Sequence, residues 1–156
     1  MIAGGPDPET REGVELVAAV RRSGLGERVR FASGADDLPA ALALADVVVV
    51  PATRPDPSGF LAAAAQAMGR PVIVTHRGAL AEAVLPASTG WLVPGDDAGE
   101  LARALELALA LDADTRRRLG ARARAFVAET FGMAANADRI LAVYRDLSGP
   151  TLARAG

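Results

Sequence analysis

Short apolar segments alternate with amphipathic ones over the first 95 residues of the chain. Five of the apolar segments have the length of strands: Met1–Gly5, Val29–Ala32, Val47–Val50, Val72–Val74 and Gly90–Val93. The four consecutive valines at 47–50 are too apolar for a strand with one solvent face, which favours a parallel strand covered on both sides. Strands that alternate with helices predict a Rossmann-like α/β fold, with a doubly wound parallel sheet of about five strands.

Helices are expected between these strands. The first should begin with Asp7 as N-cap and Pro8 at the first helical position, and Gly24 should end it. Helices between the later strands are expected over residues 36–45, 59–68 and 78–84.

Three more helices are expected after the last strand. The first begins near Asp97, the second carries a stripe from Leu119 to Val127, and the third covers 132–148. The stripe of the third consists of Met133, Ala137, Ile140, Leu141 and Tyr144. Residues 149–156 follow no pattern, so 1–148 are assigned to one domain and 149–156 to a loose tail.

Composition excludes several classes of protein. The net charge of −2 argues against a binder of nucleic acid or of a membrane surface. With no cysteine and one histidine, His76, the chain offers neither a disulfide framework nor a thiolate or histidine-rich metal site, and no metal or cofactor is expected. No apolar run approaches the ~18 residues of a transmembrane helix, and the N-terminus lacks a signal-peptide pattern. The expected location is therefore the cytoplasm.

The stretch "RPDPSGFLAAAAQAMGRPVIVT", residues 54–75, lies where a parallel sheet binds ligands, beyond the carboxyl end of a strand. The amides of Ser58, Gly59 and Phe60 would start a helix whose dipole favours an anion such as a phosphate. A second interpretation stays open, in which Asp56 or Ser58 caps the helix and nothing binds.

A second helix start is expected after the next strand, from Thr75 to Gly78, with Glu82 one turn further on. Two helix N-termini at one sheet edge would converge on the same anion, and Arg77 could add positive charge. A hydrolase would need a triad made of Ser58, His76 and Asp56, and no G-x-S-x-G pattern supports one. No G-x-G-x-x-G or Walker pattern is present either.

Three longer stretches carry a resemblance: "GLGERVRFASGADDLPAALALADVVVVPAT", "AQAMGRPVIVTHRGALAEAV" and "TGWLVPGDDAGELARAL". From about Ile2 to Leu147 the sequence resembles the C-terminal, donor-binding domain of retaining GT-B glycosyltransferases, in particular the bacterial group-1 (family-4) sugar transferases. The resemblance implies one half of a GT-B fold. It also implies transfer of a hexose from a UDP- or GDP-sugar to an acceptor with retained configuration.

The resemblance also implies roles for single residues. The family's first glutamate, which grips sugar hydroxyls, falls on Asp56, and its second, which holds the ribose, falls on Ala64. The Phe-Gly amides that bind the diphosphate fall on Ser58-Gly59. The family's later Gly-rich turn falls on Gly78 to Glu82, so Asp56 and Glu82 are the expected catalytic residues. The nucleotide base is expected near Phe31, Ala32 and Ser33.

The chain also departs from the family. Asp56 is one methylene shorter than glutamate, and Ala64 cannot accept a hydrogen bond through its side chain. In the family another strand and helix precede Met1, with an arginine and a lysine in their turn, and this chain has no lysine. We therefore expect a rearranged five-stranded sheet or a strand donated by a partner chain.

Two functions follow from these departures. One is a donor-binding domain that is inactive alone and needs an acceptor-binding N-terminal domain or a partner chain. The alternative is a non-catalytic domain kept for nucleotide binding or for subunit pairing.

Overall fold

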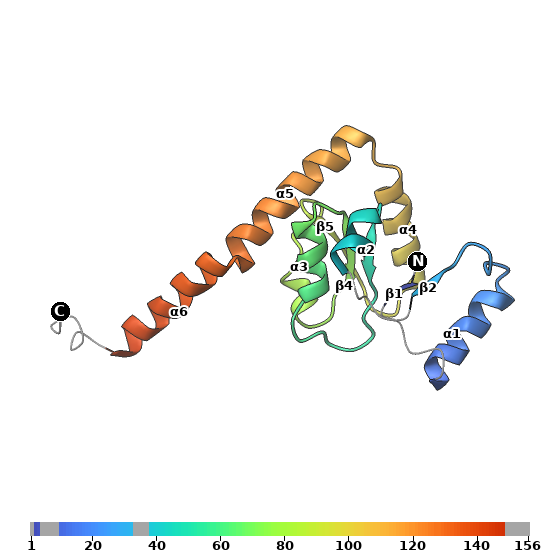
Figure 1. Ribbon diagram of the computed structural model, residues 1–156, viewed down its shortest axis with the longest axis horizontal. Coiled ribbons are helices and arrows are strands. Elements are labelled where there is room, and N and C mark those ends of the chain that lie inside the picture. Colours follow the sequence, from blue (N-terminus) through green and yellow to red (C-terminus); the bar gives the residue numbers. More distant parts are fainter. Residues whose placement is uncertain (1, 4–9, 33–37, 149–156) are drawn as a thin grey trace. The chain divides into compact units, whose positions relative to one another are not determined.

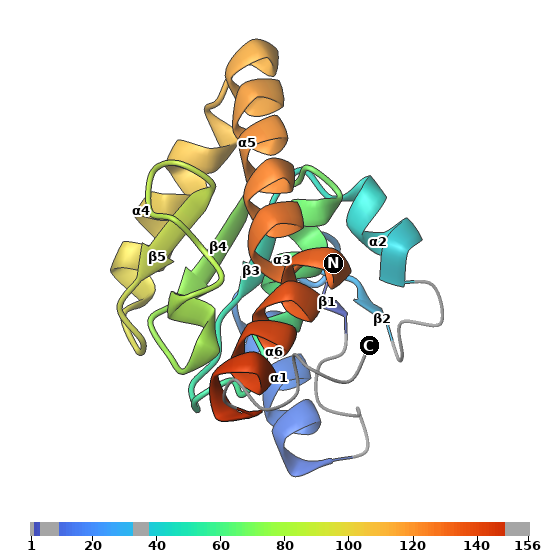
Figure 2. The same cartoon turned by 90° about the vertical axis from the view of Figure 1, so that its left-hand side faces the viewer.

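The computed structural model describes residues 2–3, 10–32 and 38–148. The chain divides into two compact units, residues 1–41 and 42–156, and helix α2 (Leu38–Leu44) spans their boundary. Figure 1 and Figure 2 show the elements in two views.

The first unit contains strands β1 (Ile2–Ala3) and β2 (Phe31–Ala32), which pair in parallel, and helix α1 (Arg11–Arg22). β2 is two residues shorter than predicted. α1 begins later than predicted, because the Thr10 side chain caps it by accepting a hydrogen bond from the Gly13 amide at 3.2 Å. The predicted cap, Asp7-Pro8, lies outside the described residues. Gly24 ends the helix as predicted, with a φ of +71° that suits a residue without Cβ.

The second unit is built on a three-stranded parallel sheet in the order β3-β4-β5. Its strands are β3 (Val48–Val50), β4 (Val72–Thr75) and β5 (Gly90–Val93). The central strand β4 is buried at every position, as the apolar run predicted. The α/β class, the parallel pairing and these strand positions are therefore confirmed to within one residue.

Helices cover both faces of this sheet. α4 (Ala98–Leu109) begins at the Asp97 cap, as predicted, and its Ala104 and Ala108 pack against Ile73 and Val93. α3 (Phe60–Ala67) lies on the opposite face and contacts β3 and β4 (Figure 1). Ala62 and Ala65 are fully buried in α3.

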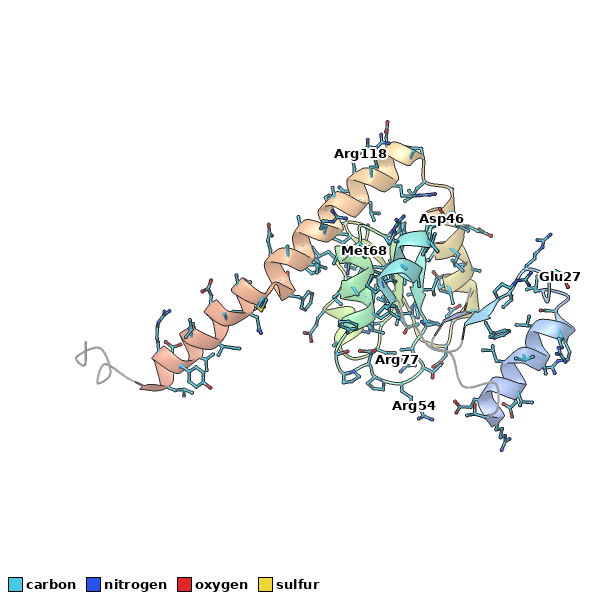
Figure 3. The ribbon with its side chains drawn as sticks, viewed as in Figure 1. Glu27, Asp46, Arg54, Met68, Arg77 and Arg118 are labelled. Atoms are coloured by element: carbon cyan, nitrogen blue, oxygen red, sulfur yellow. The ribbon has the colours of Figure 1, made fainter. Side chains whose placement is uncertain are left out.

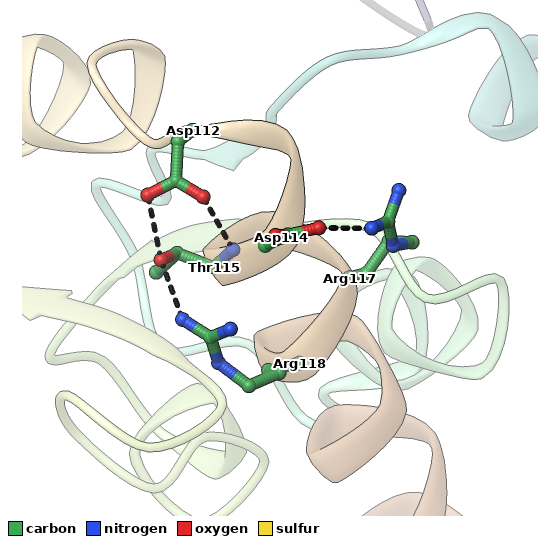
Figure 4. Close-up of polar contacts among 5 residues, drawn as sticks. All are labelled: Asp112, Asp114, Thr115, Arg117 and Arg118. Atoms are coloured by element: carbon green, nitrogen blue, oxygen red, sulfur yellow. Dashed lines mark hydrogen bonds and ion pairs between the residues drawn. The ribbon is translucent and has the colours of Figure 1, made fainter.

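Helix α5 (Ala113–Phe131) packs against α3 on the side away from the sheet (Figure 2). Figure 4 shows its start, where Asp112 accepts hydrogen bonds from the Thr115 amide and hydroxyl, both at 2.8 Å. The Thr115 hydroxyl also accepts a hydrogen bond from Arg118, and Arg117 pairs with Asp114. These caps fix the amino end of α5, whose Leu119 and Ala123 are buried.

Helix α6 (Met133–Ser148) extends from the carboxyl end of α5. The helix was predicted over the same residues, with a stripe of apolar side chains. In the structure that stripe is exposed, because the only described element with extensive contacts to α6 is its neighbour α5. Helical periodicity thus identified the element but not its burial. No described helix is both long and apolar enough to cross a membrane.

Each unit has a sheet of its own. β1 pairs with β2 in the first unit, and β4 pairs with both β3 and β5 in the second. The Val48 amide donates to the Pro71 carbonyl at 2.9 Å, on the side of β4. Because the backbone groups of successive strand residues point to opposite sides, the amide and carbonyl of Val49 point away from β4. The rearranged five-stranded sheet and the strand donated by a partner chain both stay predictions.

Candidate functional site

The candidate site lies at the carboxyl edge of the three-stranded sheet, where the loops after β3, β4 and β5 meet. Three contacts join the first two loops. Asp56 and Gly78 form a β-bridge, the Ala79 amide donates to the Asp56 carbonyl at 2.9 Å, and the Thr75 hydroxyl donates to the Ala52 carbonyl at 2.8 Å. The sequence therefore predicted correctly that these segments share one edge. Thr75 is buried, and its hydroxyl bridges the two loops.

The Asp56 carboxylate folds back onto the start of α3. Its Oδ1 accepts hydrogen bonds from the Gly59 amide at 2.6 Å and the Ser58 amide at 2.9 Å, and the Ser58 hydroxyl lies 3.4 Å away. The Phe60 amide donates to the Ser58 hydroxyl at 3.2 Å. The Gly59 amide, followed by the Ser58 amide, holds the pKa of Asp56 below its ordinary value. The amides that were predicted to bind an anion thus donate to the side chains of Asp56 and Ser58, as in the interpretation in which these residues cap the helix.

Two glycines allow the loops to approach each other. Gly59 has a φ of +61°, and a Cβ there would lie 3.1 Å from both the Ala79 carbonyl oxygen and the Ala83 Cβ. Gly78 has a φ of +57°, and a Cβ there would overlap the backbone of Asp56. The positive φ favours glycine at both positions, and at Gly78 the overlap with Asp56 also excludes a side chain.

The helix predicted over 78–84 is wrong. The structure has one 3₁₀ turn, η1 (Ala79–Ala81), after Gly78, and its following amides are bonded within the turn. Leu80, Ala83 and Val84 of this segment are buried. A three-residue turn lacks the dipole of a helix, so the expected convergence of two helix N-termini does not occur. Glu82 ends this turn and is exposed.

Arg77 points toward the loop after β5. Its Nη2 lies 2.6 Å from Asp96 Oδ2, and Gly95 leaves room for the guanidinium because a Cβ there would overlap it. Figure 3 shows Arg77 and Arg54 at the same end of this unit. Asp96 pairs with Arg77 in this structure, so the positive charge predicted to assist anion binding is balanced by a carboxylate. Asp96 was missed, although its place in the Pro94-Gly95 turn after a strand could have signalled it.

The other predicted residues differ in position. Ala64 is half-buried in the second turn of α3, and Phe60 is 64% exposed at its start. Phe31 is an exposed residue of β2 in the first unit, Ala32 follows it in the strand, and Ser33 lies outside the described residues.

The hydrolase interpretation finds no support. Ser58 contacts Asp56, but among the described residues the His76 side chain forms a hydrogen bond with neither of them. The backbone amide of His76 donates a hydrogen bond to the Val93 carbonyl at 2.8 Å. No cluster of metal-ligating side chains occurs in residues 2–3, 10–32 and 38–148.

A cavity of about 250 Å³ opens at this edge beside the loops after β3 and β5. Thr53, Thr75 and Asp96 are among its polar lining residues. The charged side chains of these loops are Arg54, Arg77, Asp56, Glu82, Asp96 and Asp97. Four carboxylates against two arginines leave the edge net acidic, so binding of a diphosphate here must rely on backbone amides.

The chain also matches a known protein family and several known proteins. Residues 1–110 match the family described as Glycosyl transferases group 1. The D-inositol 3-phosphate glycosyltransferases of Mycobacterium bovis and Mycobacterium tuberculosis are 36% identical to the chain over 152 residues. The match covers 96% of this chain and 32% of those proteins, so the chain spans about a third of the length of these curated relatives.

Solved structures confirm the fold. Sucrose-phosphate synthase from Thermosynechococcus elongatus is 37% identical, with a TM-score of 0.79 over 93% of this chain and 37% of that chain. Anabaena HepE, in a structure with UDP-glucose, is 26% identical, with a TM-score of 0.79 over 87% of this chain and 37% of that chain. The predicted Rossmann-like half of a GT-B fold is therefore correct.

Proposed function

The chain belongs to the group 1 glycosyl transferases, and on that premise we propose that it binds a nucleotide-sugar as the donor half of a retaining hexosyltransferase. One observation carries the proposal: the glycine turns at Gly59 and Gly78 meet at the carboxyl edge of the sheet, joined by the Asp56–Gly78 bridge. The UDP-glucose complex of the similar HepE supports a UDP-sugar as the donor.

In this proposal backbone amides hold the diphosphate. The amides of Ser58 and Gly59 become available when the Asp56 carboxylate turns from them toward the sugar hydroxyls. Amides aimed at the leaving diphosphate stabilise the charge that develops as the bond to the sugar breaks.

The ribose is held less tightly than the family pattern implies. Ala64 offers no side-chain acceptor, and loss of one charge-assisted hydrogen bond costs about 1.5–3 kcal/mol. That corresponds to a roughly ten- to hundredfold loss of affinity. We propose that the isolated chain turns over little or no substrate, and that transfer needs an acceptor-binding half beside it.

A second function is favoured by the same features: a domain that binds a nucleotide or pairs with a subunit without catalysis. The substitution at Ala64 and the occupied amides of Ser58 and Gly59 are the observations in its favour.

Calorimetric titration with UDP, GDP and their glucose and mannose conjugates tests the proposal. Micromolar binding of one nucleotide is expected, and Gly78→Ala should abolish it because the new methyl group forces the two loops apart. Gly69→Ala is the matched control, since Gly69 also has a positive φ but a Cβ there meets its nearest atom at 3.5 Å. Binding that survives Gly78→Ala would place the ligand elsewhere, and silence across the panel would leave only subunit pairing.

A further inference from the structure

Gln66 is a fully buried polar residue in the middle of α3. Its Nε2 donates hydrogen bonds to the Ala83 carbonyl at 2.6 Å and to the Ala62 carbonyl at 3.2 Å. Its Oε1 is buried and has no partner among the described residues. Both neighbours of the amide group are carbonyls, so only the NH₂ end can face them and the unpaired atom is the oxygen.

An apolar side chain would fill this place without an unpaired oxygen of its own, but it would leave the Ala83 carbonyl without its donor. A buried acceptor without a partner costs about 1–3 kcal/mol, and a residue of similar length such as methionine has no such atom. The bond from Gln66 to Ala83 therefore provides something that burial alone does not.

That bond joins α3 itself to the segment 78–84, and we call it a tether together with a second bond that joins the loop before α3 to the same segment. The tether from the loop is at the start of the site, where the Ala79 amide donates to the Asp56 carbonyl. The tether from α3 is the bond from Gln66 to Ala83, at the far end of the same segment. Between them Gly59 approaches Ala79 and Ala83 so closely that a Cβ would be crowded. The two tethers together set the spacing of the Gly59 and Gly78 turns.

We propose that Gln66 is a positioning residue for the donor diphosphate. It touches no ligand itself; it holds the segment 78–84 against α3 so that both glycine turns contact one diphosphate. This role rests on the proposed donor site.

The test is Gln66→Met, with affinities for UDP and GDP compared with those for uridine and guanosine. The variant removes one unpaired acceptor, Gln66 Oε1, and creates another, the Ala83 carbonyl, so its midpoint in urea should change little. Its nucleotide affinity should fall about tenfold, equivalent to about 1.4 kcal/mol, whereas nucleoside affinity should not change. Equal weakening of both, or no weakening, overturns the role.

Thr89→Val is the matched control. Thr89 is also a buried polar residue bonded to backbone, with its hydroxyl accepting from the Leu85 amide at 3.0 Å, but it has no bond to α3. This variant should lose stability and keep its nucleotide affinity. A tenfold loss of nucleotide affinity in Thr89→Val as well would show a general effect of core polar groups and overturn the specific role of Gln66.

A second measurement needs no variant. Gln66 is the only glutamine in the chain and Asn136 the only asparagine, so the side-chain amide signals are readily assigned by NMR. The Gln66 NH₂ signals should exchange slowly and shift on addition of nucleotide but not of nucleoside; the absence of a shift overturns the role. If the wild type binds none of the four probes, the donor site itself fails. If it binds and Gln66→Met binds equally, only the role of Gln66 fails.

Discussion

Replacing Asp56 by alanine removes two hydrogen bonds from the candidate site, those that the Ser58 and Gly59 amides donate to its carboxylate. The carboxylate occupies the Ser58 and Gly59 amides at 2.9 and 2.6 Å, and these are the donors proposed for the diphosphate. A phosphate oxygen can reach them only after the carboxylate has turned away. Asp56→Ala should therefore raise the affinity for a nucleotide that carries no sugar.

The magnitude follows from three contributions. In the wild type each amide exchanges a carboxylate for a phosphate, whereas in the variant each gains a charged acceptor in place of water, and at this exposed site the two bonds together contribute about 1.5 kcal/mol. Loss of a like charge about 4 Å away contributes about 1 kcal/mol in water. Against these gains, the turn loses a cap that contributes about 1 kcal/mol to its order. The net effect is about 1.5 kcal/mol, or roughly tenfold tighter binding of UDP.

Titration calorimetry with UDP and UDP-glucose measures both roles of Asp56. Asp56→Asn is the control, because its side-chain oxygen still accepts from the same amides without charge, and its gain for UDP should be smaller than that of alanine. If Asp56 grips the sugar, the preference for UDP-glucose over UDP should fall in both variants. Circular dichroism should show that Asp56→Ala is folded. If the folded variant binds UDP no better than the wild type, the carboxylate and the diphosphate do not compete for the same amides.

Three further results are expected. Ala64→Glu should tighten nucleotide binding roughly ten- to hundredfold by restoring an acceptor for the ribose, and an unchanged affinity by calorimetry would show that the ribose lies elsewhere. Hydrogen bonds from Thr115 hold the pKa of Asp112 below its ordinary 3.8, so this carboxylate stabilises the fold above about pH 4 and loses that contribution as the pH falls through the lower pKa of the folded state. The urea midpoint should therefore drop less between about pH 5 and 2.5 in Asp112→Asn than in the wild type, and an equal drop would contradict the cap. Ile73→Ala should lower the free energy of unfolding by about 2–5 kcal/mol, because Ile73 is fully buried between the sheet and α4, and a loss below 1 kcal/mol in urea titration would contradict that packing.

Local signals in the sequence predicted the second unit well. The valine runs of β3 and β4 identify buried strands because a strand with a solvent face would need polar alternation. Asp97 and Gly24 mark helix ends through chemistry that depends on only a few neighbouring residues.

Features that depend on distant contacts were not predicted. Residues 78–84 have helical composition, but the structure forms a single 3₁₀ turn there, at whose start Gly78 and Ala79 are bonded to Asp56 in another loop. The charge of Arg77 was visible, whereas its pairing with Asp96, nineteen positions later, depends on how two loops fold. Gln66 was passed over because a polar residue in a helix is usually exposed, and only the structure shows it buried.

The alanines of α3 limit which sequences this domain can accept. Ala62 and Ala65 are fully buried, and the same helix directly follows Gly59, where the approach to Ala79 and Ala83 would crowd a methyl group. A larger side chain at either alanine would push the helix outward and carry the Gly59 turn with it. During evolutionary drift these two buried positions should therefore tolerate as few residue types as Gly59 and Gly78 do.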